Sequence, residues 1–137
     1  MRPRNPAYRT YFRRIALSAA LYLVAIFAAV HLLHHRAPAS PLAIAIALVP
    51  GLAVLAMILA IVRLLVELDD EYLRLLEVRK ALIATALTLA VTSVWGLLEM
   101  FTAVPRLEVF WVFPLWCLGL VAGQIVNRVT MGTGGCA

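Results

Sequence analysis

Apolar residues gather in four long runs along this chain, separated by short segments that carry charges, prolines or glycines. The runs cover approximately residues 15–33, 41–66, 81–103 and 109–126. Each run is close to the roughly 20 apolar residues that an α-helix needs to cross a bilayer core of about 30 Å. The pattern therefore predicts an all-α membrane protein with four transmembrane helices, folded as a single membrane domain over residues 1–137.

Charged residues in the stretch 70–80 lead into the third run without an intervening glycine or proline. Asp69 precedes this stretch and is the expected N-cap of the helix. Glu77 and Lys80 stand at the i,i+3 spacing of a surface ion pair. Because a helix rises 1.5 Å per residue, the amphipathic extension is expected to protrude from the membrane by about 15 Å.

A stripe of small and polar residues runs along one face of the third predicted helix. Steps of three or four residues separate its members, which are Thr85, Thr88, Thr92, Gly96 and Glu99. Such a face is expected to pack on protein instead of lipid. The threonines are expected to donate back to carbonyls one turn earlier; a polar pathway through the membrane is the alternative.

Glu99 places a carboxylate inside the hydrocarbon region, where an ionised group needs a partner or water. We expect a structural ion pair with Arg106, which lies seven residues further along the chain. The alternative is a proton- or cation-coupled carboxylate. Arg106 joins Arg36 and Glu108 in a charge cluster that is predicted at the outer face of the membrane.

Pairs of small residues mark two predicted packing faces. Gly119 and Gly123 form a Gly-x-x-x-Gly motif in the fourth run, and Asn127 extends the same face by one turn. Ala56 and Ala60 form a similar pair in the second run, which is expected to begin with Ser40 as its N-cap. Small residues at this spacing allow helix backbones to approach closely in lipid.

His31 and His35 stand at the i,i+4 spacing at which two imidazoles can share a metal ion on one helix face. This spacing makes a metal- or haem-binding protein an alternative. The pair lacks a third ligand at a defined spacing, and histidines at a helix end are also typical of a solvated headgroup region. We therefore expect no cofactor.

Basic residues fix the expected orientation. Ten of the twelve Lys and Arg residues fall in the N-terminal segment, the second connection and the C-terminal segment. The positive-inside rule therefore predicts that both termini, and the extension of the third helix, lie in the cytoplasm. The first run of 19 residues exceeds the roughly 7–15 apolar residues of a secretory signal, so a retained anchor is favoured over a signal cleaved near Ala37.

Composition separates this chain from soluble proteins and from nucleic-acid-binding proteins. Hydrophobic residues make up 64% of it and charged residues 14%, and the mean hydropathy is +0.97. Soluble domains have about 45–50% apolar and about 25% charged residues. The net charge of +5 comes from residues at the ends of apolar runs, which form no face of their own, so no nucleic-acid partner is expected.

The segment from Glu67 to Val112 resembles a family of small bacterial inner-membrane proteins of unassigned function. Three shared features carry the resemblance, and here they are Glu77 to Lys80, Trp95-Gly96-Leu97-Leu98-Glu99, and Pro105 with Phe110-Trp111. They correspond to an amphipathic lead-in, an aromatic-Gly-x-x-Glu end of the third span, and an entry to the fourth span. The resemblance covers about a third of the chain. It implies a bacterial inner membrane and four spans, and it implies no activity.

These observations predict an integral membrane protein without enzymatic chemistry. Its expected mode of action is helix packing in the lipid bilayer, as a homo-oligomer or as an accessory subunit of a larger membrane complex. One alternative is a small proton- or cation-coupled transporter or channel that uses Glu99. The second is a metal- or haem-binding protein that uses His31 and His35. The sequence contains no nucleotide-binding loop, no C-x-x-C motif and no nucleophile elbow, so an enzyme is not expected.

Overall fold

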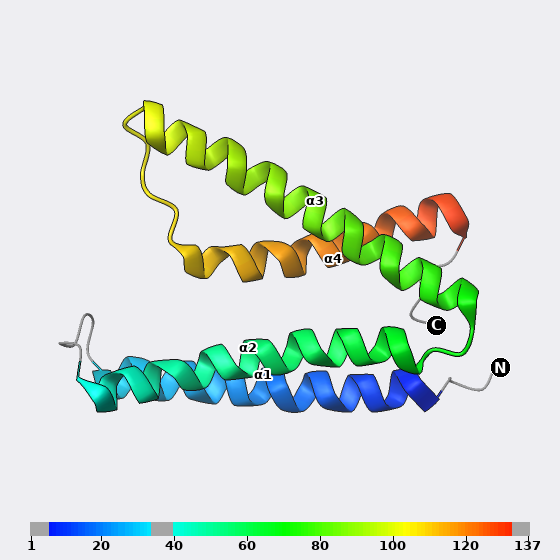
Figure 1. The fold of residues 1–137 in the computed structure, drawn as a ribbon, viewed down its shortest axis with the longest axis horizontal. Helices are drawn as coiled ribbons and strands as arrows, with labels where there is room; N and C mark the ends of the chain where they lie inside the picture. The colour runs from blue at the N-terminus through cyan, green and yellow to red at the C-terminus, as the bar shows by residue number, and fades with distance from the viewer. Residues whose placement is uncertain (1–5, 34–39, 133–137) are drawn as a thin grey trace. The chain divides into compact units, whose positions relative to one another are not determined.

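The computed structural model describes residues 6–33 and 40–132, and within these ranges all regular structure is helical. The elements in order are α1 (Pro6–Leu33), α2 (Pro41–Glu67), α3 (Glu71–Phe101), the short 3-10 helix η1 (Val109–Trp111) and α4 (Val112–Met131) (Figure 1). Helices α1, α2 and α3, and α4 taken together with η1, are each long and apolar enough to cross a membrane. The prediction of an all-helical protein with four such helices is confirmed.

The helix ends follow local sequence signals. Ser40 caps α2, because its Oγ accepts the Ala43 N–H at 3.2 Å, as predicted. The N-cap of α3 is Asp70, whose Oδ1 accepts the N–H groups of Tyr72 at 2.9 Å and Leu73 at 3.3 Å. The expectation that Asp69 caps this helix is therefore wrong by one residue. Two adjacent aspartates carry the same capping chemistry, and only the path of the backbone selects between them.

The helices differ in extent from the apolar runs. Helix α1 begins at Pro6, well before residue 15, because proline is compatible with the first turn of a helix. Helix α3 continues without a break from the charged extension into its apolar part. Helix α4 continues past residue 126 to Met131 and ends at Gly132, whose φ of 72° is the left-handed conformation that glycine favours after a helix.

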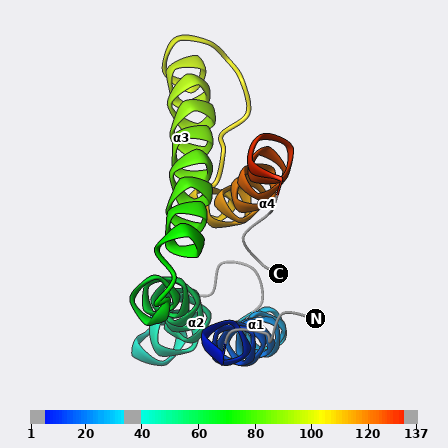
Figure 2. The same ribbon diagram turned by 90° about the vertical axis from the view of Figure 1, so that its right-hand side faces the viewer.

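The chain divides into two compact units, residues 1–68 and residues 69–137. In the first unit α1 and α2 lie side by side, as Figures 1 and 2 both show. Small residues fill their contact, since Ala25, Ala53 and Ala60 are buried. Of the predicted small pair, Ala60 is therefore buried, and Ala56 is half-buried. The expectation of one membrane domain stays a prediction.

An ion pair joins the two helices of the first unit near one end. The Arg14 Nη1 lies 2.8 Å from Glu67 Oε1 and 2.9 Å from Glu67 Oε2. Both side chains are about one-third exposed, so solvent screens the pair and its contribution to stability is small. The contact aligns the start of α1 with the end of α2, as an antiparallel pair of helices requires.

Candidate functional site: the α3–α4 contact and its loop

Two glycines bring α4 against α3 in the second unit. Gly119 and Gly123 are buried. A Cβ atom on Gly119 would lie 2.7 Å from the Cα of Ala84, and one on Gly123 would lie 2.7 Å from the carbonyl oxygen of Lys80. A methyl group has no room at either distance, because the neighbouring atoms belong to backbone. The glycines therefore permit backbone contact between the helices.

The residues of this contact recur at intervals of four on both helices. On α3 they are Leu76, Lys80, Ala84 and Thr88, all of them buried, and on α4 they are Gly119, Gly123 and Asn127. Packing of such i,i+4 ridges against each other produces an oblique crossing. Figure 1 shows α3 and α4 crossing obliquely and lying farther apart where the loop of residues 102–108 joins them.

Asn127 closes the contact at the end away from that loop. The side chain is fully buried, and its Nδ2 donates to the Leu76 carbonyl oxygen at 2.8 Å. Within the described residues its Oδ1 is buried without a hydrogen-bond donor. An unpaired buried acceptor costs on the order of 1–3 kcal/mol. The four-residue spacing from Gly123 correctly predicted that Asn127 lies on the glycine face of α4. Its hydrogen bond to a carbonyl of α3 could not be predicted from the sequence.

The pair formed by Glu77 and Lys80 differs from the expected surface ion pair. The Lys80 Nζ contacts the Glu77 Oε2, and the two residues are only 8% and 4% exposed. Gly123 accounts for part of this burial, because its missing side chain lets α4 approach the backbone and the Cγ of Lys80. The sequence pattern showed a charged face here and could not show that a glycine would cover it.

Within the chain, the members of the predicted stripe on α3 lie in different surroundings, and its packing as one face stays a prediction. Thr88 and Thr92 donate to the Ala84 and Thr88 carbonyl oxygens at 2.8 and 2.7 Å, which is the back-bonding expected for threonine in a helix. Thr85 accepts the Trp116 indole N–H of α4 at 3.1 Å. At Gly96 a Cβ would meet no atom within 4 Å. Thr88 therefore belongs to the α3–α4 contact, whereas Gly96 borders open space.

The Glu99 carboxylate binds a backbone amide. Its Oε1 accepts the Leu107 N–H at 2.5 Å, and the side chain is half-buried. No ion pair joins Glu99 to Arg106 in the described part of the chain, and Arg106 is exposed. The expectation that Arg106 pairs with Glu99 is therefore wrong, and the partner is the Leu107 amide. The loop turns so that a peptide N–H, instead of a guanidinium group, faces the carboxylate.

A second hydrogen bond fixes the same loop to α3. The indole Nε1 of Trp95 donates to the Pro105 carbonyl oxygen at 3.2 Å. Trp95 and Glu99 are four residues apart and thus lie on one face of the helix. Together their side chains bind the loop at Pro105 and Leu107.

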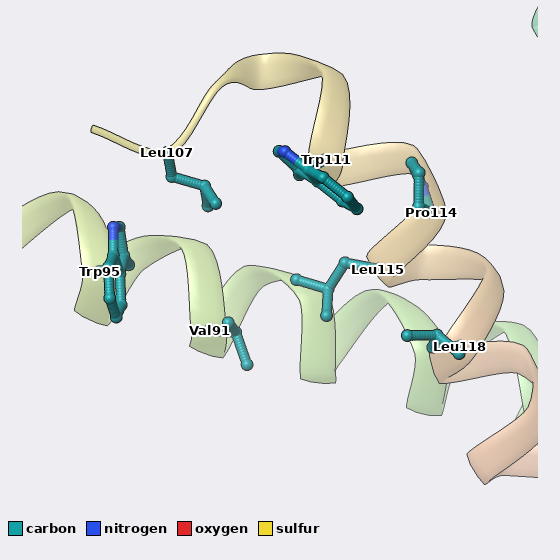
Figure 3. A pocket seen from close by; sticks show the side chains of 7 residues that line it. All are labelled: Val91, Trp95, Leu107, Trp111, Pro114, Leu115 and Leu118. Atoms are coloured by element: carbon teal, nitrogen blue, oxygen red, sulfur yellow. The ribbon is translucent and has the colours of Figure 1, made fainter. Parts of the chain in front are cut away.

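An apolar cavity of about 270 Å³ lies between the loop, α3 and α4. Tryptophans from both sides of the loop contribute to its lining, as Figure 3 shows. The main lining residues are Val91, Trp95, Leu107, Trp111, Leu115 and Leu118. The sequence held no signal for a cavity, because the space depends on the angle at which the helices cross.

The histidines and the outer charges are only partly described. His31 is exposed in the last turn of α1, and its ring centroid lies 4.4 Å from that of Phe27. His35 and Arg36 fall outside the described residues. The described residues contain no group of three side chains able to hold a metal ion. Arg106 and Glu108 are both exposed on the loop after α3.

Comparison of the chain with known protein families, with curated proteins and with solved structures gave no match. The resemblance of residues 67–112 to the small bacterial inner-membrane proteins therefore stays a prediction. Function is therefore inferred from two features of this chain: the glycine contact between α3 and α4, and the loop bound by Trp95 and Glu99.

Proposed function

We propose that this protein is a non-enzymatic integral membrane protein that acts by helix packing, as a homo-oligomer or as an accessory subunit of a larger membrane complex. The α3–α4 contact carries the proposal. It shows glycine at backbone contact distance in Gly119 and Gly123, together with a buried side-chain bond from Asn127. In lipid, close packing and interhelical hydrogen bonds drive helix association, since burial of apolar surface from water is absent there.

Gly96 supports the same proposal on the surface of α3. It lies one turn beyond Thr92 in an apolar helix, and a side chain at this position would meet no atom within 4 Å. A small residue that borders open space offers a partner helix the close approach that Gly119 and Gly123 offer within the chain. The proposed partner is a transmembrane helix of a second copy or of another membrane protein.

The proposed location is the bacterial inner membrane, with both termini in the cytoplasm. The ten basic residues of the N-terminal segment, the second connection and the C-terminal segment support this orientation. The apolar character of all four described helices supports the membrane itself.

The geometry at Glu99 favours packing over the coupled transporter. A coupling carboxylate must exchange its partner during transport, whereas Glu99 accepts a peptide N–H that belongs to a loop also bound by Trp95. The metal- or haem-binding alternative gains no support from the described residues, because they contain no group of three side chains able to hold a metal ion.

Photocrosslinking in the native membrane tests the proposal. A small diazirine side chain is placed at Gly96, and a matched one at Ala90, which is also exposed on α3. The expected result is a discrete protein adduct from position 96, either with a second copy or with one other membrane protein, and mainly lipid adducts from position 90. Lipid adducts alone from position 96 would contradict the proposal. A proton flux in proteoliposomes that Glu99→Gln abolishes would establish the transporter instead.

A further inference from the structure

The apolar cavity at the loop end of the α3–α4 contact follows from how these helices cross. The backbones touch where Gly119 meets Ala84, and the helices diverge from there toward the loop (Figure 1). Side chains fill part of the space between them and leave about 270 Å³. Figure 3 shows Leu107 and Leu115 directed into the space between Trp95 and Trp111.

The walls of this cavity are held in place. Trp95 donates its indole N–H to the Pro105 carbonyl, so its ring has a fixed position on the loop. Leu107 is fixed by its own amide, which Glu99 accepts at 2.5 Å. A cavity with bonded walls keeps its shape when a ligand leaves, and this preorganisation favours binding.

We propose that this cavity binds one acyl chain of a zwitterionic phospholipid, with phosphatidylethanolamine as the fitting chemical type. The lining side chains are apolar, so water gains no hydrogen-bond partner there. An empty space would forfeit dispersion contacts with its lining. The volume is just below the roughly 300–1,000 Å³ of small-molecule sites. A transmembrane helix, about 10–12 Å across with its side chains, is too wide to enter.

The charges beside the cavity select the headgroup. Arg106 and Glu108 flank the lining residue Leu107, both are exposed, and neither forms an ion pair within the described part of the chain. A guanidinium group suits a phosphate, and a carboxylate suits an ammonium group. Phosphatidylethanolamine carries both charges, whereas Glu108 repels the headgroup of an anionic lipid.

Native mass spectrometry of the full chain, released from detergent and titrated with defined lipids, measures this binding. The expected result is one phosphatidylethanolamine retained per chain, with weaker retention of phosphatidylglycerol. Glu108→Gln is expected to remove the preference between the two lipids. Arg106→Gln is expected to weaken the binding of both, and Arg63→Gln, at an exposed arginine of the other unit, serves as its matched control.

A matched pair of substitutions on α3 tests the position of the acyl chain. Val91→Phe adds a ring inside the cavity and is expected to weaken lipid binding about tenfold or more, which corresponds to about 1.4 kcal/mol. Val94→Phe makes the same change at an exposed residue outside the lining, and it is expected to leave binding unchanged. Equal binding by the two variants would overturn the proposal.

A second measurement on the wild-type chain covers the case in which Val91→Phe fails to fold. Vesicles of phosphatidylcholine receive rising fractions of phosphatidylethanolamine with brominated acyl chains, which quench tryptophan fluorescence on contact. Because two tryptophans line the cavity, we expect a saturable loss of fluorescence at low fractions of the brominated lipid. A loss that only follows the bulk fraction would overturn the proposal. Dimers that exclude lipid would also overturn the proposal, because the partner would then cover the cavity in place of an acyl chain.

Discussion

The carboxylate of Glu99 and the backbone amide of Leu107 lie 2.5 Å apart and form a hydrogen bond across the loop that leaves α3. The bond gives the Glu99 carboxylate a partner without a second charged side chain. A hydrogen bond to a charged acceptor is stronger than one between neutral groups, and a low-dielectric surrounding strengthens it further. Glu99 therefore reads as a structural residue that fixes the loop, and its substitutions test that role directly.

Glu99→Leu is expected to lower the free energy of unfolding by about 1–3 kcal/mol, because it leaves the Leu107 N–H without its acceptor. Glu99→Gln retains a carbonyl oxygen and is expected to lose less. Reversible unfolding in detergent micelles, followed by circular dichroism, measures both. Arg106→Gln is the control, and the Glu99–Arg106 double-mutant cycle is expected to show no coupling. A coupling energy of several kcal/mol would show that Glu99 and Arg106 form an ion pair and would contradict this prediction.

Substitution of glycine by alanine is expected to have opposite effects at two positions. Gly123→Ala places a methyl group 2.7 Å from the Lys80 carbonyl oxygen, so the helices must separate, and we expect a loss of about 1–3 kcal/mol. In the monomer Gly96→Ala meets no atom of the chain within 4 Å, so in detergent it is expected to stabilise α3 by up to about 1 kcal/mol. The midpoints of thermal unfolding in one detergent compare the two variants. Equal midpoints would show that Gly123 faces lipid.

The helices of this protein were predictable because their signals are local. The apolar runs gave four helices, and the Ser40-Pro41 pair gave the start of α2. The choice of Asp70 over Asp69 as the cap of α3 was not predictable, because neighbouring aspartates have the same chemistry and differ only in backbone path.

The candidate site was less predictable, since its contacts depend on how elements meet. The spacing of Gly119 and Gly123 predicted a packing face, but it could not predict that Lys80 is the residue that Gly123 contacts. Similarly, Arg106 was the nearest opposite charge to Glu99 in the sequence, while the path of the loop presented the Leu107 amide. Charges can be read from a sequence, but backbone donors in an irregular loop cannot.

The buried side chain of Asn127 gives a prediction that separates its two polar atoms. Asn127→Leu removes the stabilising Nδ2 bond to Leu76 and also the penalty of the unpaired Oδ1. These two effects have opposite signs, so stability is expected to change by less than about 1 kcal/mol. Asn127→Asp replaces the donor with an oxygen that faces a carbonyl, and it is expected to be the more damaging change by several kcal/mol. Equilibrium unfolding measures both, with Gln124→Glu as the half-buried control on the same helix. A tolerated Asn127→Asp would show that water reaches this site.

The proposed orientation predicts where single cysteines can be labelled. In a chain whose natural cysteines are replaced by serine, a cysteine at Glu108 is expected to react with a membrane-impermeant maleimide in intact cells from which the outer membrane has been removed. A cysteine at Asp70 is expected to react only after permeabilisation. The reason is the distribution of basic residues, ten of twelve of which fall on the side of Asp70, and moving such charges across an energised membrane is unfavourable. Labelling at Asp70 from outside would reverse the orientation and place the charged start of α3 outside the cytoplasm. Both positions are exposed and belong to the same unit, so a difference between them reports the side of the membrane and not the accessibility of the side chain.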